Sequence, residues 1–338
     1  KVNKLQKSVQ EVSDSAAELS SKADQLDALY PDDPTVSSAA AAASSAEVQG
    51  PSAQEESTDT SAASDSSESS GSKDSSSSTQ EEGTLSPSSG STFTDNSDSS
   101  MDNLLNQVQS LLPTDNGTWS VYVCNLAKNT EGTINDQQMQ AASLIKLYIM
   151  GTVYEDYDSL SSKYSKDQLD NALNSMITVS DNDAANTLTT YLGGGNSSAG
   201  MQAVNSFCQE HGYTQTHMGR MLLASNDQDD NYTSVNDCRH FLIEVYKEEE
   251  SSYAHASDMY ALLKAQTRQN KIPAMLPDGV KTANKTGELD NVENDAGIIY
   301  DAANDLVIVF MSQNLSSAGN AQNTIASLSR TIYDYYNN

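Results

Sequence analysis

Hydrophobic residues recur at helical spacing in the first thirty residues of the chain. They follow one another in alternating steps of three and four, with polar residues between them, at Val2, Leu5, Val9, Val12, Ala16, Leu19, Ala23 and Leu26. This is the a/d pattern of a coiled coil over about four heptads, although the small side chains would make its core weak. The pattern predicts a short coiled coil or a lone amphipathic helix over residues 1–30, and any self-association is expected through this segment.

The hydrophobic pattern is absent between residues 31 and 100. This segment contains 24 serines, an alanine run, 13 Asp and Glu residues against one lysine, and a single aromatic residue, Phe93. Such a segment cannot bury enough apolar surface to offset the conformational entropy that folding removes. We therefore expect residues 31–100 to form a disordered, self-repelling linker.

Helix and strand patterns return in residues 101–338, a length that suits one large domain. The pattern predicts an amphipathic helix over 101–112 and a strand hairpin over 118–136, with its turn at 128–132. Several helices follow from 143 to about 268, then three strands over 281–313 and a closing helix over about 318–336. Because strands lie on both sides of a helical middle, we expect an α+β fold. One antiparallel sheet would be flanked by helices, with an all-helical subdomain beside it.

The chain is strongly acidic, with a formal net charge of −29. A surface of this charge repels phosphate backbones and anionic lipid, so a nucleic-acid partner is not expected. No run of about 18 apolar residues occurs, and any membrane anchor would therefore lie outside this sequence. A coil followed by a long serine-rich linker suits a stalk, which favours an extracellular domain tethered to the surface of a bacterium.

The cysteines and histidines do not form a recognisable site. Three cysteines are too few for a disulfide scaffold, and the sequence leaves open whether Cys208 and Cys238 pair. The histidines lack the spacing of metal ligands: His211, His217, His240 and His255. No metal ion or other cofactor is expected.

A polar pair interrupts the apolar helix predicted after residue 142. In AASLIKLYIM, residues 141–150, Ser143 and Lys146 are three positions apart and therefore share one helix face. A buried lysine is costly unless it is paired or shifted toward its neutral form, and a nucleophilic serine needs a nearby base. A capping serine beside a lysine that reaches out to solvent would explain the tetrapeptide equally well on its own.

Two further motifs decide between these interpretations. S-D-N opens a predicted helix at residues 180–182, and K-T-G lies on the first of the later strands at residues 285–287. Each is common alone, but S-x-x-K, S-D-N and K-T-G in this order and structural context form a specific signal. On these motifs, residues 101–338 resemble the superfamily of class A β-lactamases and penicillin-binding proteins. These acyl-serine enzymes react with β-lactams or with the D-Ala-D-Ala ends of peptidoglycan, and the resemblance implies their fold.

The resemblance implies a catalytic role for four side chains. Ser143, at a helix N-terminus, would attack a carbonyl carbon, with the helix dipole favouring the developing charge. Lys146, with Lys285 close by, would be disfavoured as an ammonium ion and would accept the serine proton. Ser180 would pass a proton between this cluster and the leaving nitrogen.

The resemblance also implies a set of substrate-binding residues. Asn182 would orient the substrate and the catalytic lysine, and Thr286 would hold a substrate carboxylate together with the lysine of its own motif. Gly287 has no side chain, so its strand could approach the substrate closely. The backbone N–H groups of Glu288 and of the nucleophile would form the oxyanion hole.

The sequence departs from the family pattern where class A β-lactamases carry the glutamate that activates the deacylating water. The matching loop lies in residues 216–237, where Arg220 and Asn226 fit its two ends, but Leu222 occupies the place of the glutamate. Three aspartates lie nearby but are misplaced by several residues: Asp227, Asp229 and Asp230. We therefore expect acylation of the serine to be followed by slow deacylation.

Two further departures concern the binding of a ligand carboxylate. Glu288 follows K-T-G where a small residue is usual, and its charge would repel an anionic ligand. The arginine that often helps to bind this carboxylate from the neighbouring strand is absent, since Val292 and Glu293 occupy that neighbourhood.

Together these observations predict a serine hydrolase of the class A β-lactamase type that acts through an acyl-Ser143 intermediate. Its partner would be a small-molecule β-lactam or a peptidoglycan stem peptide. Two alternatives stay open: a D,D-peptidase that acts on stem peptides, and a sensor module that is acylated slowly or not at all. The intact serine and lysine set argues against an inactive module, whereas Leu222 argues against a fast β-lactamase.

Overall fold

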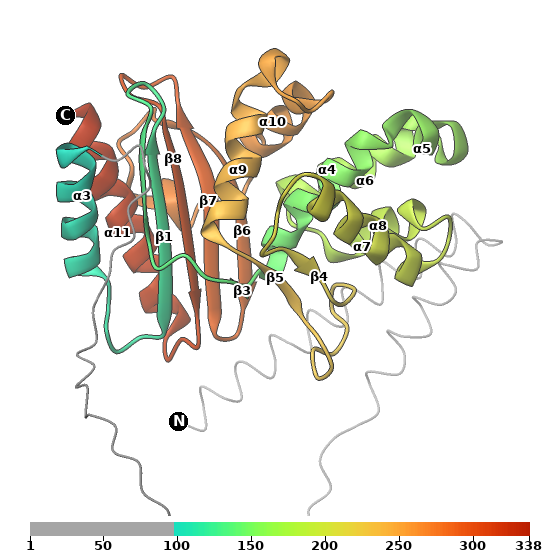
Figure 1. Cartoon of the computed structure of the whole chain (residues 1–338), viewed down its shortest axis with the longest axis horizontal. Helices are drawn as coiled ribbons and strands as arrows, with labels where there is room; N and C mark the ends of the chain where they lie inside the picture. Colours follow the sequence, from blue (N-terminus) through green and yellow to red (C-terminus); the bar gives the residue numbers. More distant parts are fainter. Residues whose placement is uncertain (1–97) are drawn as a thin grey trace, which may run out of the picture. The chain divides into compact units, whose positions relative to one another are not determined.

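The computed structural model describes residues 98–338. The coiled coil predicted for residues 1–30 and most of the linker predicted for residues 31–100 lie outside this part, but residues 98–100 already cap and begin the first helix. Figure 1 shows a sheet with helices on both faces and a further group of helices beside it. The strand order is β2-β1-β8-β7-β6, and all neighbouring strands are antiparallel. The strands are β1 (Thr118–Asn125), β2 (Thr130–Ile134), β6 (Lys281–Leu289), β7 (Val292–Tyr300) and β8 (Leu306–Gln313). This confirms the predicted α+β fold, because β1 and β8 join the two ends of the domain.

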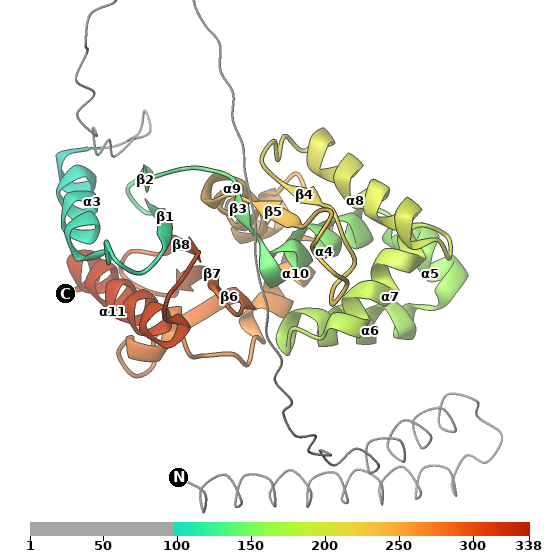
Figure 2. The ribbon, with the colours of Figure 1, turned by 90° about the horizontal axis from the view of Figure 1, so that it is seen from below.

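Both faces of this sheet are buried, which explains why its strands are hydrophobic at consecutive positions. Successive residues of β8 such as Ile308 and Val309 belong to different cores. Two helices cover one face, as Figure 2 shows: α3 (Ser99–Leu111) and α11 (Ala318–Asn337). Two helices pack against the strands from the opposite face: α9 (Val235–Tyr246) and α10 (Ala256–Lys264).

The group of helices beside the sheet is continuous in the chain. Its members are α4 (Ile145–Glu155), α5 (Tyr157–Tyr164), α6 (Lys166–Thr178), α7 (Asn182–Leu192) and α8 (Ser197–Glu210). Short 3-10 helices occur at Ala142–Leu144, Glu248–Glu250 and Ile272–Met275. A small second sheet has the order β3 (Met139–Gln140), β5 (Asn231–Thr233) and β4 (His217–Met218). The sequence did not predict this second sheet, because strands this short carry no alternating hydrophobic pattern.

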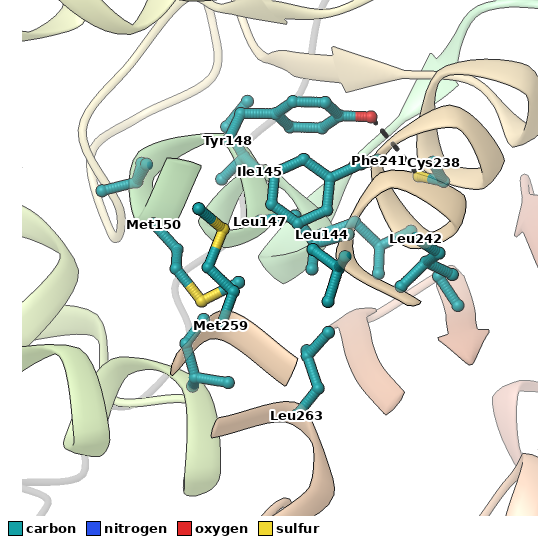
Figure 3. Close-up of a cluster of buried hydrophobic side chains, with 14 of the residues drawn as sticks. Leu144, Ile145, Leu147, Tyr148, Met150, Cys238, Phe241, Leu242, Met259 and Leu263 are labelled. Atoms are coloured by element: carbon teal, nitrogen blue, oxygen red, sulfur yellow. Dashed lines mark hydrogen bonds between the residues drawn. The ribbon is translucent and has the colours of Figure 1, made fainter. Parts of the chain in front are cut away.

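Helix α4 is the buried centre of this group. Every residue from Ile145 to Tyr154 is buried, including one lysine. Figure 3 shows its apolar side chains packed against residues of α9 and α10, such as Phe241 and Leu263. In the same cluster the hydroxyl of Tyr148 donates a hydrogen bond to Sγ of Cys238, 3.6 Å away. A helix held on all sides in this way gives the side chains of its first turn a fixed position.

The first hairpin turn lies at residues 126–129 rather than 128–132, because Asn129 adopts the left-handed conformation (φ 52°) and closes the turn there. All three cysteines are buried and free, so Cys208 and Cys238 do not pair. No helix in residues 98–338 has the length and apolar character of a membrane span.

The close approach of α7 and α8 yields a test of the packing that supports residues 180–182. A Cβ added at Gly200 would lie 1.7 Å from the carbonyl oxygen of Thr189, so the two helices would have to move apart. We predict that Gly200→Ala lowers the free energy of unfolding, measured by chemical denaturation, by about 1–3 kcal/mol. The matched control is Gly319→Ala in α11, where no atom other than its chain neighbours and the backbone of its own helix lies within 4 Å of the added Cβ. It should change stability little or raise it by up to about 1 kcal/mol, and equal losses in the two variants would contradict this account.

Candidate functional site

Three segments that are distant in the sequence meet at the sheet edge formed by β6. They are the turn Ala142–Leu144 that leads into α4, the residues 180–182 that begin α7, and the middle of β6. Asn294 of β7 holds the turn in place, because its Nδ2 donates to the carbonyl oxygens of Gln140 (2.9 Å) and Ala141 (3.1 Å). The eight site residues named from the sequence all lie on these segments or on the first turn of α4.

Lys146 lies at the centre of a hydrogen-bonded cluster and is fully buried. Its Nζ is 3.1 Å from Oγ of Ser143, the residue one turn earlier. The same nitrogen is 2.7 Å from Oδ1 of Asn182. It also contacts Ser180 twice, at 2.6 Å from the carbonyl oxygen and 3.2 Å from Oγ.

These partners suit a neutral amine. A neutral amine has two N–H donors and one lone pair, and the carbonyl oxygen of Ser180 and Oδ1 of Asn182 can only accept. The two N–H groups therefore go to these oxygens, and the lone pair is left for a hydroxyl hydrogen such as that of Ser143. Burial lowers the pKa of Lys146 to about 7, although the Asp181 carboxylate opposes this shift. The sequence-based expectation attributed the shift to Lys285, but burial is its main cause.

Ser180 connects the two lysines. Nζ of Lys285 donates to Oγ of Ser180 and to the carbonyl oxygen of Thr286, both at 2.8 Å. Lys285 is fully buried, and burial together with the nearby Lys146 holds the pKa of Lys285 well below its ordinary value. Ser180 has a φ of 62°, a conformation that costs energy in a residue with a side chain. With this backbone, both the hydroxyl and the carbonyl of Ser180 reach Lys146.

The side chain of Asp181, the middle residue of S-D-N, caps helix α7. Oδ1 of Asp181 accepts a hydrogen bond from the backbone N–H of Ala184 at 2.6 Å, which caps the N-terminus of α7. The backbone N–H of Asp181 donates to the carbonyl oxygen of Ser175, at 3.1 Å. This cap fixes the residues on either side of Asp181, whose side chains contact Lys146.

Gly287 lets β6 press against the turn that carries the serine. A Cβ at this position would lie 2.8 Å from the carbonyl oxygen of Ala141 and 3.2 Å from the backbone nitrogen of Ser143. The structure shows a close contact of this strand with the turn. The close approach of the strand to a substrate, expected from the sequence, stays a prediction. The contact brings Gly287 close to the backbone of Ser143, and Glu288 is the next residue of the strand.

The loop between β4 and β5 forms another wall of the site. Leu222 lies with Ser143, Asn182 and Glu288 around a cavity of about 290 Å³. Asn186 of α7 holds the backbone of this leucine through two hydrogen bonds, from Leu222 N to Oδ1 (2.9 Å) and from Nδ2 to Leu222 O (3.0 Å). The leucine is therefore fixed beside the serine.

None of the three loop aspartates lines this cavity. Oδ1 of Asp230 accepts a hydrogen bond from Nε of Arg220 at 2.7 Å. Oδ2 of Asp229 lies 2.7 Å from Nε2 of His217, and Asp227 is exposed. The loop thus holds no carboxylate toward the serine.

Sequence reasoning missed two basic residues, which follow α10 and belong to no motif. Arg268 lines a cavity of about 120 Å³ together with Ser143, Ser180, Asn182, Thr286 and Glu288. The site therefore has an arginine after all, although it comes from a loop rather than from the neighbouring strand. Lys271 is fully buried, and its Nζ lies 2.9 Å from Glu288 and 2.5 Å from Glu293.

In residues 98–338, no group of three His, Cys, Asp or Glu side chains is arranged to hold an ion. Three of the histidines instead pair with single carboxylates: His211 with Glu155, His217 with Asp229, and His255 with Asp258.

The sequence of the chain matches a known family. The sequence model of the beta-lactamase enzyme family matches residues 103–163 and 159–336. The chain belongs to this family. A search of curated proteins found no match.

Solved structures of beta-lactamases and of PBP-A share the fold. PBP-A is 23% identical to this chain, with a TM-score of 0.60 over 69% of this chain and 95% of PBP-A. A beta-lactamase from Sphaerobacter thermophilus is 20% identical, with a TM-score of 0.59 over 69% of this chain and 97% of its own. A class A beta-lactamase from Bacteroides cellulosilyticus is 20% identical, with a TM-score of 0.61 over 71% and 99% of the two chains.

The electrostatics of Lys146 in this beta-lactamase family member can be measured directly. In a protein with ¹³Cε-labelled lysine, the Lys146 resonance, assigned by its loss in Lys146→Arg, should titrate near pH 7 because burial lowers its pKa. Asp181→Asn keeps a capping side chain on α7 but removes the charge that raises this pKa, so the midpoint should move to lower pH. A midpoint near that of a free lysine, or an upward shift in Asp181→Asn, would contradict the assignment.

Proposed function

We propose that this protein is a serine hydrolase of the class A β-lactamase type that forms an acyl-enzyme at Ser143 with β-lactams or D-Ala-D-Ala-type amides and releases it slowly. One observation carries the proposal. The Nζ of Lys146 lies 3.1 Å from Oγ of Ser143, and its pKa is lowered by burial to about 7. A base with a pKa near the working pH, in hydrogen-bond contact with a hydroxyl, is what a serine nucleophile requires.

In the acylation step, Oγ of Ser143 attacks the amide carbonyl carbon while its hydroxyl proton moves to Nζ of Lys146. The carbonyl π electrons move to oxygen, and the backbone N–H groups of Ser143 and Glu288 would stabilise this oxyanion. The close contact of Gly287 with the turn brings these two stretches of backbone together, which supports the assignment.

Expulsion of the leaving nitrogen follows when the tetrahedral intermediate collapses and its C–N bond breaks. The nitrogen takes a proton from Oγ of Ser180, and Lys146, 3.2 Å from that oxygen, supplies the replacement. Lys285 keeps the Ser180 oxygen in place from 2.8 Å. Asn182 and Thr286 line the cavities beside Ser143 and would orient the substrate.

Release of the acyl group requires a water molecule that adds to the ester carbon and loses a proton to a base. Leu222 occupies the wall where this base is expected, and its apolar side chain can neither hold nor deprotonate water. Asp227, Asp229 and Asp230 do not line the cavity and offer no replacement. These observations support an acyl-enzyme that accumulates.

A D,D-peptidase that acts on peptidoglycan stem peptides is the second candidate, and Leu222 is the observation that favours it. The two activities share the acyl-enzyme and differ in the acyl donor. A leucine-to-glutamate variant of PBP-A has been solved as an acyl-enzyme complex with penicillin G, so penicillin acylates another protein with this fold. For a sensor module, the acyl-enzyme itself would be the end product. Each of these roles suits an extracellular, surface-tethered position in a bacterium, where peptidoglycan lies.

The first test of this proposal concerns the nucleophile and its base. Penicillin G should add to the protein covalently, and Ser143→Ala should abolish the adduct in intact-mass measurements on timed samples. Lys146→Ala should slow its formation by about 10²–10⁴-fold, which is the usual contribution of a positioned base. Lys163→Ala, at an exposed position on α5, serves as the control and should react like the wild type. An adduct that survives in Ser143→Ala would place the nucleophile elsewhere.

The second test concerns release of the acyl group. After free drug is removed, the penicilloyl adduct should persist, because no base activates water beside it. Leu222→Glu supplies a carboxylate at that wall and should shorten the lifetime of the adduct. Leu222→Gln, whose side chain has the shape of glutamate but no charge, should leave the lifetime long. The gain expected for a general base is about 10²–10⁴-fold. Fast, repeated turnover by the wild type would show that a base exists elsewhere, and Asp227→Asn would then be the next variant to measure.

A further inference from the structure

Glu288 is held in an unusual electrostatic setting at the edge of the site. It lies on β6 directly opposite Glu293 of β7, and like charges in such a cross-strand pair repel. Lys271 relieves this repulsion, because its buried Nζ contacts both carboxylates, Glu288 at 2.9 Å and Glu293 at 2.5 Å. Glu293 is buried, with its other oxygen accepting a hydrogen bond from Gln322 at 2.8 Å, whereas the Glu288 side chain is 32% exposed.

Glu288 also reaches the accessible cation of the site. Its Oε2 lies 3.4 Å from Nη1 of Arg268, whose side chain is 45% exposed. The lysines of the cluster, Lys146 and Lys285, are fully buried, and the pKa of each is lowered by burial. Among the described basic residues that line the cavity with Ser180 and Thr286, Arg268 is thus the one available to an incoming anion. The carboxylate of Glu288 already binds this arginine.

The charge on Glu288 is present at neutral pH. Partial burial raises the pKa of this carboxyl group, but the charge and hydrogen bond of Lys271, together with the nearby Arg268 and Lys285, outweigh burial and hold the pKa below its ordinary value. Glu288 lines both cavities that include Ser143. A ligand carboxylate bound there would have to share Arg268 with a fixed negative charge.

We propose that Glu288 is a specificity residue that favours acyl donors without a carboxylate. At the position where β-lactams and D-Ala-D-Ala ends carry their carboxylate, the preferred donor has a neutral group such as an ester or amide. This inference rests on the proposed acylation of Ser143 and refines the class of substrate. Donors with a carboxylate still react, but their binding is weakened by repulsion from Glu288 and by competition for Arg268. The chemical class that fits best is therefore a peptide or lactam whose terminal carboxylate is masked.

A matched pair of ligands tests this selection. Penicillin G and its methyl ester contain the same reactive ring and differ in the one charge at issue. The quantity to measure is the ratio of their second-order rate constants for acylation of Ser143, acid over ester, by intact mass. Glu288→Gln keeps the shape and an oxygen for Lys271 but removes the charge, and the ratio should rise by about 10–100-fold.

Two further variants show where the effect arises. Glu293→Gln removes an equal charge from the buried side of the same lysine and should leave the ratio close to that of the wild type. Glu288→Gln combined with Arg268→Gln should lose the part of the gain that the freed arginine provides and keep the part that comes from removing the repulsion. If Glu288→Gln does not fold, as judged by its melting transition, Glu288→Ala replaces it in the same measurement.

The outcomes separate this inference from the proposed function. Acylation by both ligands with the same ratio in the wild type and Glu288→Gln would overturn the role of Glu288 and leave the proposed function standing. An equal rise in Glu293→Gln would also overturn it, because the effect would then belong to Lys271. If neither ligand acylates Ser143 in any variant, the proposed function fails and this inference fails with it.

Discussion

The burial of two amines around one serine hydroxyl is the constraint on which the rest of this site depends. Lys146 and Lys285 are both fully buried, and both contact Oγ of Ser180. Burial disfavours the charged form of each amine and lowers the pKa of each lysine, and for Lys285 the nearby Lys146 adds to this effect. A neutral amine needs acceptors for its N–H groups and a hydrogen-bond donor for its lone pair. The carbonyl oxygens around these lysines meet the first need, and for Lys146 the hydroxyl of Ser143 meets the second.

The fold keeps this cluster together although its parts are far apart in the sequence. Helix α4 is buried on all sides, and the cap at Asp181 sets the start of α7. Asn294 ties the turn that carries Ser143 to the sheet, and Gly287 lets β6 come into contact with that turn. Each of these features removes freedom from a side chain that must stay within hydrogen-bond distance of Lys146. Such preorganisation by rigid elements is a general requirement of catalytic sites.

Local spacing made part of this arrangement predictable from the sequence. The strand patterns predicted the sheet, and a separation of three residues predicted a shared face for Ser143 and Lys146, whose atoms lie 3.1 Å apart. The distant contacts carried no such signal. Arg268 lies in a loop that contains no motif. In the sequence, Lys271 cannot be told from a surface lysine, because its two glutamate partners are brought together only by strand pairing. The main cause of the lowered pKa of Lys146 is burial, which depends on the packing of the whole helical group.

The central claim is that a neutral Lys146 acts as the base for Ser143, and the pH dependence of acylation tests it most directly. The second-order rate constant for adduct formation with penicillin G, measured from pH 5 to 9, should fall about tenfold per pH unit below a midpoint near 7, the pKa to which burial lowers this lysine. The residual reaction of Lys146→Ala should lack this step. A wild-type rate that stays constant through pH 7, or the same step in Lys146→Ala, would contradict the account.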